Sequence, residues 1–536
     1  MENSNLVYGV KDRPNFGKVL VFALQQLLAI LAATIAVPSI IGNGMSQSAA
    51  LFGAGAGTLI YLLFTRFKSP VFLGSSFAFL GSMVAAFAGA VTVNAGFLGL
   101  IIGAILAGLV YVVLAMIIKA CGTGWINKIM PAVVIGPTVA LIGLSLAGNA
   151  VGDIMNSNYG FGPSNDGSGT LQWVNTASIC IGLLTLFVTI ICSVFGKKML
   201  KMIPFIIGIA AGYLAATAVT AIGHFGHYDS LNLIHFEVFK NMKWYPDFAF
   251  INAFKSFKDF GDVGTFFSYL GTITLAYVPV AFVVFAEHIA DHKNLSSIID
   301  QDLLTDPGLD NTLLGDGIGS MVGAFFGGCP NTTYGESIGC VAISGNASVI
   351  TIFVTACMAI VASFFAPFTT LLSTIPGCVM GGVCIALYGF IAVSGLKMIQ
   401  NVDLGDNRNL FVVSVILICG VGGLTLNVLV GTSIFGGVLF YKTVKLTSIA
   451  TALILGIIVN AICSIGRKEK AVSVIDNGVD VDELEASLQA ELEEEVAEEE
   501  TEEATDEELT LKDLDILKEQ GLISDEEYEE KKKNLK

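Results

Sequence analysis

The sequence predicts an all-α integral membrane protein of about fourteen transmembrane segments, arranged as two inverted repeats of seven. Three observations support this fold class. The 536 residues are 54% hydrophobic and 14% charged, with a mean hydropathy of +0.74, whereas soluble proteins carry about 25% charged residues. Apolar runs of transmembrane length recur along the chain. Two of these runs are interrupted by polar residues at matching places in the two halves.

The apolar runs are about 20 residues long, which is the length that crosses a bilayer as a helix. In the first half they lie at 19–41, 49–64, 71–90, 96–118, 129–148, 174–195 and 203–222. In the second half they lie at 265–290, 311–328, 332–344, 349–366, 376–396, 409–425 and 446–465. We therefore expect residues 19–466 to form the membrane domain.

Lys and Arg in the short loops predict how these segments are oriented. If residues 1–18, with Lys11 and Arg13, are cytoplasmic, the basic loops after every second segment also fall inside, and an even number of segments places both termini in the cytoplasm. The polar N-terminus has no cleavable signal pattern, so the first run is expected to remain as a span of the cell membrane. Lys442 and Lys445 do not fit this orientation.

The net charge of −17 arises entirely from the C-terminal end, where residues 467–536 hold 26 acidic and 9 basic residues. Residues 467–509 lack long apolar faces and are expected to be a disordered acidic linker. Residues 510–536 contain Leu-rich turns and a capping box at Ser524 and Glu527, and they resemble a SHOCT-type helical hairpin. We expect a tail-mediated protein contact or oligomerisation there; a partly helical, solvated tail is the alternative.

No catalytic or metal-binding motif is present. The ten cysteines lie mostly in apolar runs without a CxxC pair, and the five histidines form no HExxH motif. The cysteines are expected to be small buried residues rather than disulfides or metal ligands. We therefore predict neither an enzyme nor a cofactor, and nothing indicates nucleic-acid binding.

The two interrupted segments begin with LGSSFAF at 73–79 and CPNTTYGES at 329–337. Broken segments at corresponding places in two halves indicate a transporter whose binding site lies where they meet. Their free backbone groups need polar partners other than lipid, and a bound polar ligand can supply them. The alternative is a close helix-packing site made of small residues.

Few acidic residues lie at membrane depth, and each is a candidate for function because an Asp at the centre of a span costs about 3 kcal/mol to insert. Glu287 and Asp291 are four residues apart and share a helix face, with His288 beside them. Two carboxylates so close in a poorly hydrated site raise one another's proton affinity, which suits a proton-coupled carrier. Glu336 lies in the second broken segment.

The other charged residues of this region also have purely structural interpretations. Asp291, His292 and Lys293 also fit the solvated cytoplasmic end of the helix, and for His292 and Lys293 we favour that reading. Asp316, between glycines in LLGDGIGSMVG, is expected to support the site or simply to hydrogen-bond a neighbouring helix.

Several stretches resemble the nucleobase–ascorbate transporter family, and in particular its bacterial uracil-transporting branch. The resemblance rests on LQQLLAILAATIAVP (24–38), LGSSFAF, GTGWINKIMPAVVIGPTVALIGLSLAG (122–148), the region 285–344 with FAEHIADH and PNTTYGES, and IPGCVMGGVCIALYG (375–389). It implies a core domain made of segments 1–4 and 8–11, a gate domain made of segments 5–7 and 12–14, and a homodimer formed through the gate domains.

The resemblance also implies roles for individual residues. Glu287 and Glu336 would accept hydrogen bonds from the ring N–H groups of uracil, and the backbones around Phe77, Tyr334 and Gly335 would meet its carbonyls. Ala33 and Phe77 would line the pocket. Acceptor carboxylates and helix N-terminal amides are chemically complementary to this ring. Proton coupling would involve Glu287, Asp291, Glu336 and His288.

Two positions depart from the family's usual pattern. Asp291 stands where the uracil-transporting members usually have His, which leaves the coupling residue open and also leaves proton or sodium open as the coupling ion. Ser337 stands where they usually have Asn and is expected to affect substrate range.

The sequence therefore predicts a secondary active transporter that imports uracil with a proton, by movement of the core against the gate. A purine permease, a sodium-coupled nucleobase transporter, an anion exchanger or channel, and a membrane receptor remain as alternatives.

Overall fold

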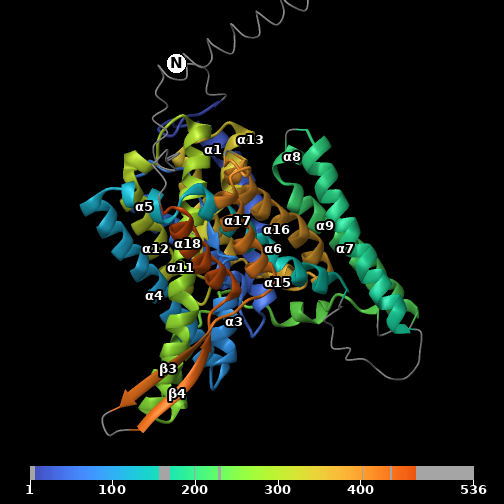
Figure 1. The fold of residues 1–536 in the computed structure, drawn as a ribbon. Helices are drawn as coiled ribbons and strands as arrows, with labels where there is room; N and C mark the ends of the chain where they lie inside the picture. Colours follow the sequence, from blue (N-terminus) through green and yellow to red (C-terminus); the bar gives the residue numbers. More distant parts are fainter. Residues whose placement is uncertain are drawn as a thin grey trace, which may run out of the picture. The chain divides into compact units, whose positions relative to one another are not determined.

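The computed structural model describes residues 6–155, 170–197, 199–226, 231–400, 402–434 and 438–465. The predicted linker at 467–509 and the predicted hairpin at 510–536 lie outside the described residues. In the described part the chain is almost entirely helical, with two short antiparallel strand pairs (Figure 1).

The described part of the first half contains nine helices or helical turns and one strand. They are α1 (Phe16–Ile41), α2 (Gln47–Phe64), β1 (Leu73–Ser75), α3 (Leu80–Ala88), α4 (Val93–Cys121), α5 (Gly124–Ile129), α6 (Ala132–Met155), α7 (Thr170–Phe195), α8 (Met199–Met202) and α9 (Pro204–Gly226). A connection follows with η2 (Phe236–Asn241), α10 (Phe250–Lys255) and η3 (Ser256–Phe260).

The second half repeats this order. It contains α11 (Val263–Ile299), η4 (Leu304–Gly308), α12 (Leu309–Phe325), β2 (Asn331–Thr333), α13 (Gly335–Ser344), α14 (Val349–Ser363), α15 (Ala366–Ser373), α16 (Gly377–Ile399), α17 (Asn407–Val421), β3 (Asn427–Ile434), β4 (Val438–Lys445) and α18 (Ser448–Cys463).

The helix packing shows the inverted repeat directly. Helix α1 packs on α13 and α14, and in the same way α11 packs on α3 and α4. Helix α2 packs on α14 as α12 packs on α4, while α2 and α12 pack on each other across the repeat. The remaining membrane helices form a second group, in which α6 of the first repeat packs on α16 of the second. Helix α6 also packs on α17 and α18, and α16 correspondingly packs on α7 and α9. The predicted inverted-repeat membrane fold is confirmed.

Eight of the described helices are long and apolar enough to cross a membrane: α1, α2, α4, α6, α7, α9, α11 and α16. The expected segment at 349–366 differs from the prediction, because α14 ends at Ser363 and α15 continues at an angle of 82°. Pro367 lies in the first turn of α15, where its fixed φ angle favours the start of a new helix.

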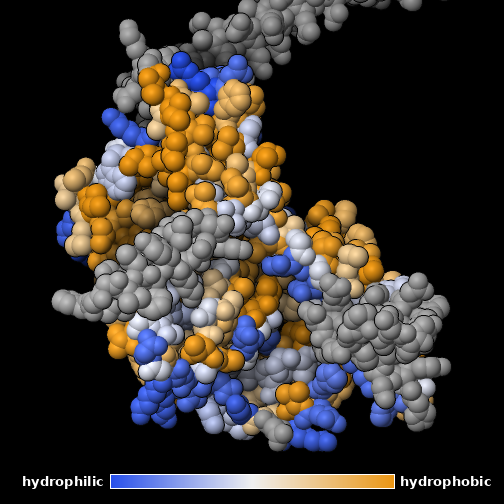
Figure 2. Space-filling model, turned by 60° about the horizontal axis from the view of Figure 1, so that its bottom comes forward, coloured by the Kyte–Doolittle hydropathy of each residue, from blue (hydrophilic) through white to orange (hydrophobic). Residues whose placement is uncertain are grey.

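The flanks of the membrane helices present apolar side chains to the surroundings. On α7, for example, Phe187, Ile191 and Val194 are each more than half exposed. Figure 2 shows such hydrophobic residues over much of the surface, with hydrophilic residues gathered mainly toward the lower part of that view. A surface of this kind is stable in lipid, because only a bilayer covers so much apolar area.

The cysteines are only partly buried. All ten are free thiols, and four of them are buried, whereas Cys121 and Cys180 are exposed on helix surfaces. The expectation that they are buried is therefore right for some and wrong for others, because an apolar run in a membrane helix has a face that packs on protein and a face that meets lipid.

Strands β3 and β4 form a hairpin that the sequence analysis did not predict. They pair antiparallel from Asn427 opposite Lys445 to Ile434 opposite Val438. The hairpin lies beside α11 (Figure 1). Lys442 and Lys445, which did not fit the orientation, belong to β4 rather than to a short loop between two spans.

Helix α11 is the longest helix of the described chain, with 37 residues. Asp262 caps its N-terminus by accepting hydrogen bonds from the backbone N–H and the hydroxyl of Thr265, at 2.8 and 2.7 Å. These two bonds lower the pKa of the Asp262 carboxyl. The helix continues to Ile299, well beyond the predicted end at residue 290, so Asp291, His292 and Lys293 lie inside it.

Candidate functional site

The two interrupted segments meet and pair with each other. Strand β1 pairs antiparallel with β2, from Leu73 opposite Thr333 to Ser75 opposite Asn331. Further backbone bonds extend the pairing, since Ser76 N–H donates to the Pro330 carbonyl at 2.9 Å. The backbone groups freed by each break are thus satisfied by the other break, as a membrane interior requires. We call this region, with the first turns of α3 and α13, the β1–β2 crossing.

Glycines allow the crossing to pack closely. A Cβ atom at Gly57 of α2 would lie 2.3 Å from Nδ2 of Asn331, which itself donates to the Gly53 carbonyl at 2.9 Å. The ring of Tyr334 lies against Gly74 of β1, where a Cβ would be 2.3 Å from it. The small-residue packing expected as an alternative reading is therefore present together with the broken segments, and the two readings do not exclude each other.

Helix α13 starts at the crossing and carries Glu336 in its first turn. The N-terminus of a helix presents unpaired N–H groups and a partial positive charge, so it favours an acceptor ligand or a carboxylate. Helix α3 starts at Leu80, directly after the other half of the crossing. The two helix N-termini come from opposite repeats and follow the two paired strands.

The predicted carboxylates gather on one side of the crossing. Asp291 is 8% exposed and its Oδ2 accepts a 2.6 Å hydrogen bond from the Thr333 hydroxyl of β2. Glu287, one turn earlier on α11, is half-buried, and its Oε2 has no hydrogen-bond partner. Asp291, Asp316 and Glu336 all interact electrostatically with Glu287. Glu287, Asp291 and Glu336 thus form one acidic cluster around an unpaired carboxylate oxygen.

An open space adjoins this cluster at Gly335. The residue is exposed, and a Cβ built on it would meet no atom within 4 Å. The preceding residue, Tyr334, turns its side chain away into the protein, where its hydroxyl donates to the Ser75 carbonyl at 3.0 Å. The backbone at Tyr334 and Gly335 is therefore what this segment presents to the space.

Phe77 and Ala33 are both buried next to the crossing. Phe77 is 6% exposed, and its ring meets that of Tyr388 on α16 edge to face, with 5.4 Å between centroids. Ala33 of α1 is fully buried beside Thr34, whose carbonyl accepts from the Ser75 hydroxyl at 3.0 Å. Phe77 thus connects the crossing to the second group of helices.

Ser337 faces away from this space. It is fully buried, and its Oγ accepts from the Phe72 N–H at 3.0 Å and from Nε2 of Gln26 at 2.5 Å. Ser337 therefore joins α13 to β1 and to α1. Gln26 was not among the predicted site residues, although a pair of glutamines inside the apolar run LQQLLAI was an available signal.

Two histidines of α11 are buried on a neighbouring face. Nδ1 of His288 lies 2.7 Å from Oδ2 of Asp316. Asp316 therefore hydrogen-bonds a neighbouring helix, which was the simpler of its two predicted roles. His292 is 1% exposed, and its Nε2 lies 2.6 Å from the Tyr61 hydroxyl. The prediction that His292 belongs to a solvated helix end is wrong, because α11 extends further and α2 covers that turn.

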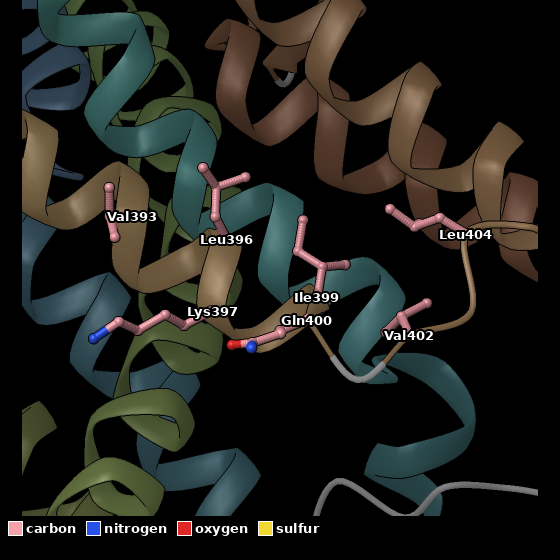
Figure 3. Close-up of a pocket in the computed structure, with 7 residues that line it drawn as sticks. All are labelled: Val393, Leu396, Lys397, Ile399, Gln400, Val402 and Leu404. Carbon is pink, nitrogen blue, oxygen red and sulfur yellow. The ribbon is translucent and has the colours of Figure 1, made fainter. Parts of the chain in front are cut away.

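A shallow pocket of about 480 Å³ lies elsewhere, at the C-terminal end of α16. Figure 3 shows its lining, which is Val393, Leu396, Lys397, Ile399, Gln400, Val402 and Leu404. It contains none of the residues expected in the site and no carboxylate. The β1–β2 crossing remains the candidate site.

Comparison with known proteins gives the family. The model of a permease family (Xan_ur_permease) matches residues 17–429. The uracil permease of Bacillus caldolyticus is 39% identical over 475 residues, which cover 88% of this chain and 97% of the relative. The uracil permease of Bacillus subtilis (strain 168) is 36% identical over 88% of this chain and 98% of its own length. The uracil permease of Escherichia coli (strain K12) is 32% identical over 78% of this chain and 88% of its own length.

Solved structures share the fold at low identity. The transmembrane domain of the cyanobacterial bicarbonate transporter BicA matches with a TM-score of 0.52 and 15% identity, over 86% of this chain and all of that chain. The structure of SLC26A9 matches with a TM-score of 0.54 and 13% identity, over 83% of this chain and 65% of that chain. From the family match and the close relatives, the chain is a multi-pass membrane protein that belongs to the permease family.

Proposed function

We propose that this permease imports uracil together with a proton, and that uracil binds at the β1–β2 crossing. The observation that carries the proposal is the acidic cluster of Glu287, Asp291 and Glu336 beside the open backbone at Gly335. Three of its relatives are uracil permeases that align over most of the chain. Both lines of support point to a small polar ring as the substrate.

The chemistry of the cluster suits a ligand that donates hydrogen bonds. Carboxylates accept only, and uracil offers two ring N–H groups flanked by carbonyls. In our proposal Glu287 and Glu336 accept from those N–H groups, and backbone N–H groups near Phe77 and Tyr334–Gly335 donate to the carbonyls. The unpaired Oε2 of Glu287 is a free acceptor of the kind this role needs.

The same cluster argues against an anion as substrate. Two of the solved structures that share the fold are a bicarbonate transporter and an anion transporter, which leaves anion transport open on fold alone. Three carboxylates around the site would repel an anion, so a neutral ring is favoured. A proton bound in the cluster would reduce the repulsion among the carboxylates, and this links proton binding to substrate binding.

We further propose that transport proceeds by alternating access, with α1–α4 and α11–α14 moving as a core against a gate made of the other membrane helices. The Phe77–Tyr388 ring contact crosses this division and would change during the movement. We also propose that both termini lie in the cytoplasm, which the Lys and Arg pattern of the short loops supports, and that the protein forms a homodimer through the gate helices, which the family resemblance supports.

Equilibrium binding to the purified protein tests the substrate. Labelled uracil is expected to bind and to be displaced by unlabelled uracil far better than by xanthine or bicarbonate. Glu336→Gln is expected to lose this binding, because an amide at that position presents a donor as well as an acceptor. Glu237→Gln, at an exposed position on η2, is the matched control and should bind normally. Displacement by xanthine but not by uracil would reject the substrate assignment.

A further inference from the structure

The connection between α9 and α11 contains a short amphipathic stretch. It consists of α10 (Phe250–Lys255) followed directly by η3 (Ser256–Phe260). Its sequence, FINAFKSFKDF, combines four Phe with two Lys. We call it the α10–η3 segment. An ordinary surface loop is mostly polar, so the apolar side chains of this segment need a partner.

One face of the α10–η3 segment packs on the membrane helices. Ala253 and Phe260 are buried on this face. The Phe260 ring lies 5.2 Å from that of Tyr269 on α11, and the Phe250 ring stacks on Phe325 of α12 at 5.0 Å between centroids. Both α10 and η3 also pack on α4. The segment is therefore fastened to three helices of the proposed core.

A second face is apolar but is not covered by protein. Ile251, Phe254 and Phe257 follow one another at intervals of three residues, and they are 53%, 44% and 46% exposed. At 3.6 residues per turn they span an arc of about 120° beside the buried face. The rings of Phe254 and Phe257 stack with 6.4 Å between their centroids. These three side chains form one apolar strip.

A third face is polar. It carries the exposed residues Asn252, Lys255 and Asp259, and Lys258 lies at its border with the apolar strip. Oδ2 of Asp259 accepts a 2.9 Å hydrogen bond from the hydroxyl of Thr92, the N-cap residue of α4. The described residues provide no ion pair for either lysine. A helix between protein and water needs only a buried face and a polar face, so the apolar strip indicates a third environment.

The apolar strip is continuous with the lipid-facing surface of the membrane helices. The ring of Phe257 lies 5.2 Å from that of Phe266 on α11, and Phe266 lies 5.9 Å from the exposed Phe267. Val93 and Val263, the first residues of α4 and α11, are also more than half exposed. Both helices are long and apolar enough to cross a membrane. The segment therefore lies where they enter the bilayer.

The chemistry of the segment suits the boundary between lipid and water. An amphipathic helix can lie in this boundary with its apolar face about 5–10 Å deep. Lysine side chains beside that face lay their methylene groups along the apolar region and place the ammonium near the lipid phosphates. Lys255 and Lys258 are on the correct side of the strip for this arrangement, and a phosphate would supply the anion that the described protein does not.

We propose that the α10–η3 segment is a membrane anchor that binds the phospholipid surface at the N-terminal ends of α4 and α11. Ile251, Phe254 and Phe257 lie against acyl chains, and Lys255 and Lys258 lie beside lipid phosphates. Because the segment is fastened to α4, α11 and α12, it ties the core to this leaflet. The inference goes beyond the proposed function and does not depend on the substrate or on the coupling ion.

Tryptophan fluorescence in lipid nanodiscs tests the anchor, because both sides of the disc are open to a quencher in the water. The three native tryptophans, at positions 125, 173 and 244, are first replaced by Phe. Phe254→Trp then places a single probe on the apolar strip. Asn252→Trp is the matched control, since it places the probe at an exposed position on the polar face of the same segment. Acyl chains brominated near the headgroup quench a probe in lipid, and iodide quenches a probe in water.

We expect the tryptophan of Phe254→Trp to emit at shorter wavelength, to lose most of its emission in brominated discs and to resist iodide. Asn252→Trp should show the reverse. Adding Lys255→Glu and Lys258→Glu to Phe254→Trp should restore part of the emission in brominated discs that contain anionic lipid. If Phe254→Trp does not fold, Ile251→Trp replaces it with the same expectations.

Two results would overturn the proposal. Quenching of both probes by iodide and of neither by brominated lipid would place the segment in water. Protection of the Phe254→Trp probe from both quenchers would mean that protein, such as a second copy of the chain, covers the apolar strip. Absence of uracil binding by the wild-type protein would reject the proposed function and would leave this test unaffected.

Discussion

The hydroxyl of Thr333 donates a 2.6 Å hydrogen bond to Oδ2 of Asp291. This bond attaches the second broken segment to the face of α11 that also carries Glu287. Its donor is a neutral hydroxyl, and the described residues provide no ion pair to Asp291. Asp291 is therefore positioned at the crossing without its charge being neutralised by a cation.

Replacing Asp291 by Asn should separate coupling from binding. The amide oxygen of Asn can still accept from Thr333, so the crossing keeps its geometry, but the side chain can no longer take up a proton. We expect uracil affinity within a few-fold of wild type and a strong loss of proton-driven accumulation, measured by binding and by uptake with the same preparation. Equal losses in both measurements would show that Asp291 binds substrate rather than the proton.

Ser337→Ala tests whether this residue sets structure or specificity. The change leaves the Phe72 N–H without its buried acceptor, and an unsatisfied buried group costs about 1–3 kcal/mol. The Gln26 amide loses one acceptor and keeps the backbone carbonyl of residue 337, to which its Nε2 donates at 3.2 Å. We expect a lower thermal midpoint and an unchanged ranking of competing nucleobases. A changed ranking at normal stability would mean that Ser337 contacts the substrate after all.

Two glycine substitutions should have opposite effects. Gly335→Leu places a side chain in open space, so the protein should fold and reach the membrane but lose uptake because the site is filled. Gly57→Ala places a Cβ 2.3 Å from Nδ2 of Asn331 and should reduce the amount of folded protein, since overpacking costs about 1–3 kcal/mol.

Membrane abundance and uracil uptake per molecule distinguish these two outcomes. Normal uptake by Gly335→Leu would place the substrate elsewhere. Normal folding of Gly57→Ala would mean that Asn331 is less tightly held than the structure indicates.

The membrane fold could be predicted because lipid imposes a simple rule on the sequence. A spanning helix needs a long apolar run, and the expected runs correspond closely to α1, α2, α4, α9 and α16. Broken segments also stand out, since Gly, Ser, Thr and Pro are unusual in a span, and these predicted segments do meet as β1 and β2.

Other features depend on tertiary contacts that a hydropathy pattern does not contain. His292 resembles a solvated helix end in sequence, yet α2 covers it through Tyr61. The bend between α14 and α15 lies inside a continuous apolar run, and only the Pro after Ala366 signals it. The β3–β4 hairpin has a Gly-Gly turn signal, which the surrounding apolar residues obscured.

The candidate site was identified through its charges rather than its shape. Glu287, Asp291 and Glu336 are conspicuous because charge at membrane depth is rare. Gln26 was missed because neutral amides in an apolar run cost less to insert than charges do, so the Gln25–Gln26 pair is less conspicuous. The partners of Asp316 and His288 could not be assigned from sequence, since they lie 28 residues apart on different helices.

The most direct test is the accumulation of labelled uracil in proteoliposomes with an imposed inward proton gradient and no sodium, comparing wild type with Glu336→Gln. We expect accumulation above equilibrium by wild type, its collapse on addition of an uncoupler, and its loss in Glu336→Gln. Accumulation that persists with the uncoupler and requires sodium, or undiminished uptake by Glu336→Gln, would contradict it.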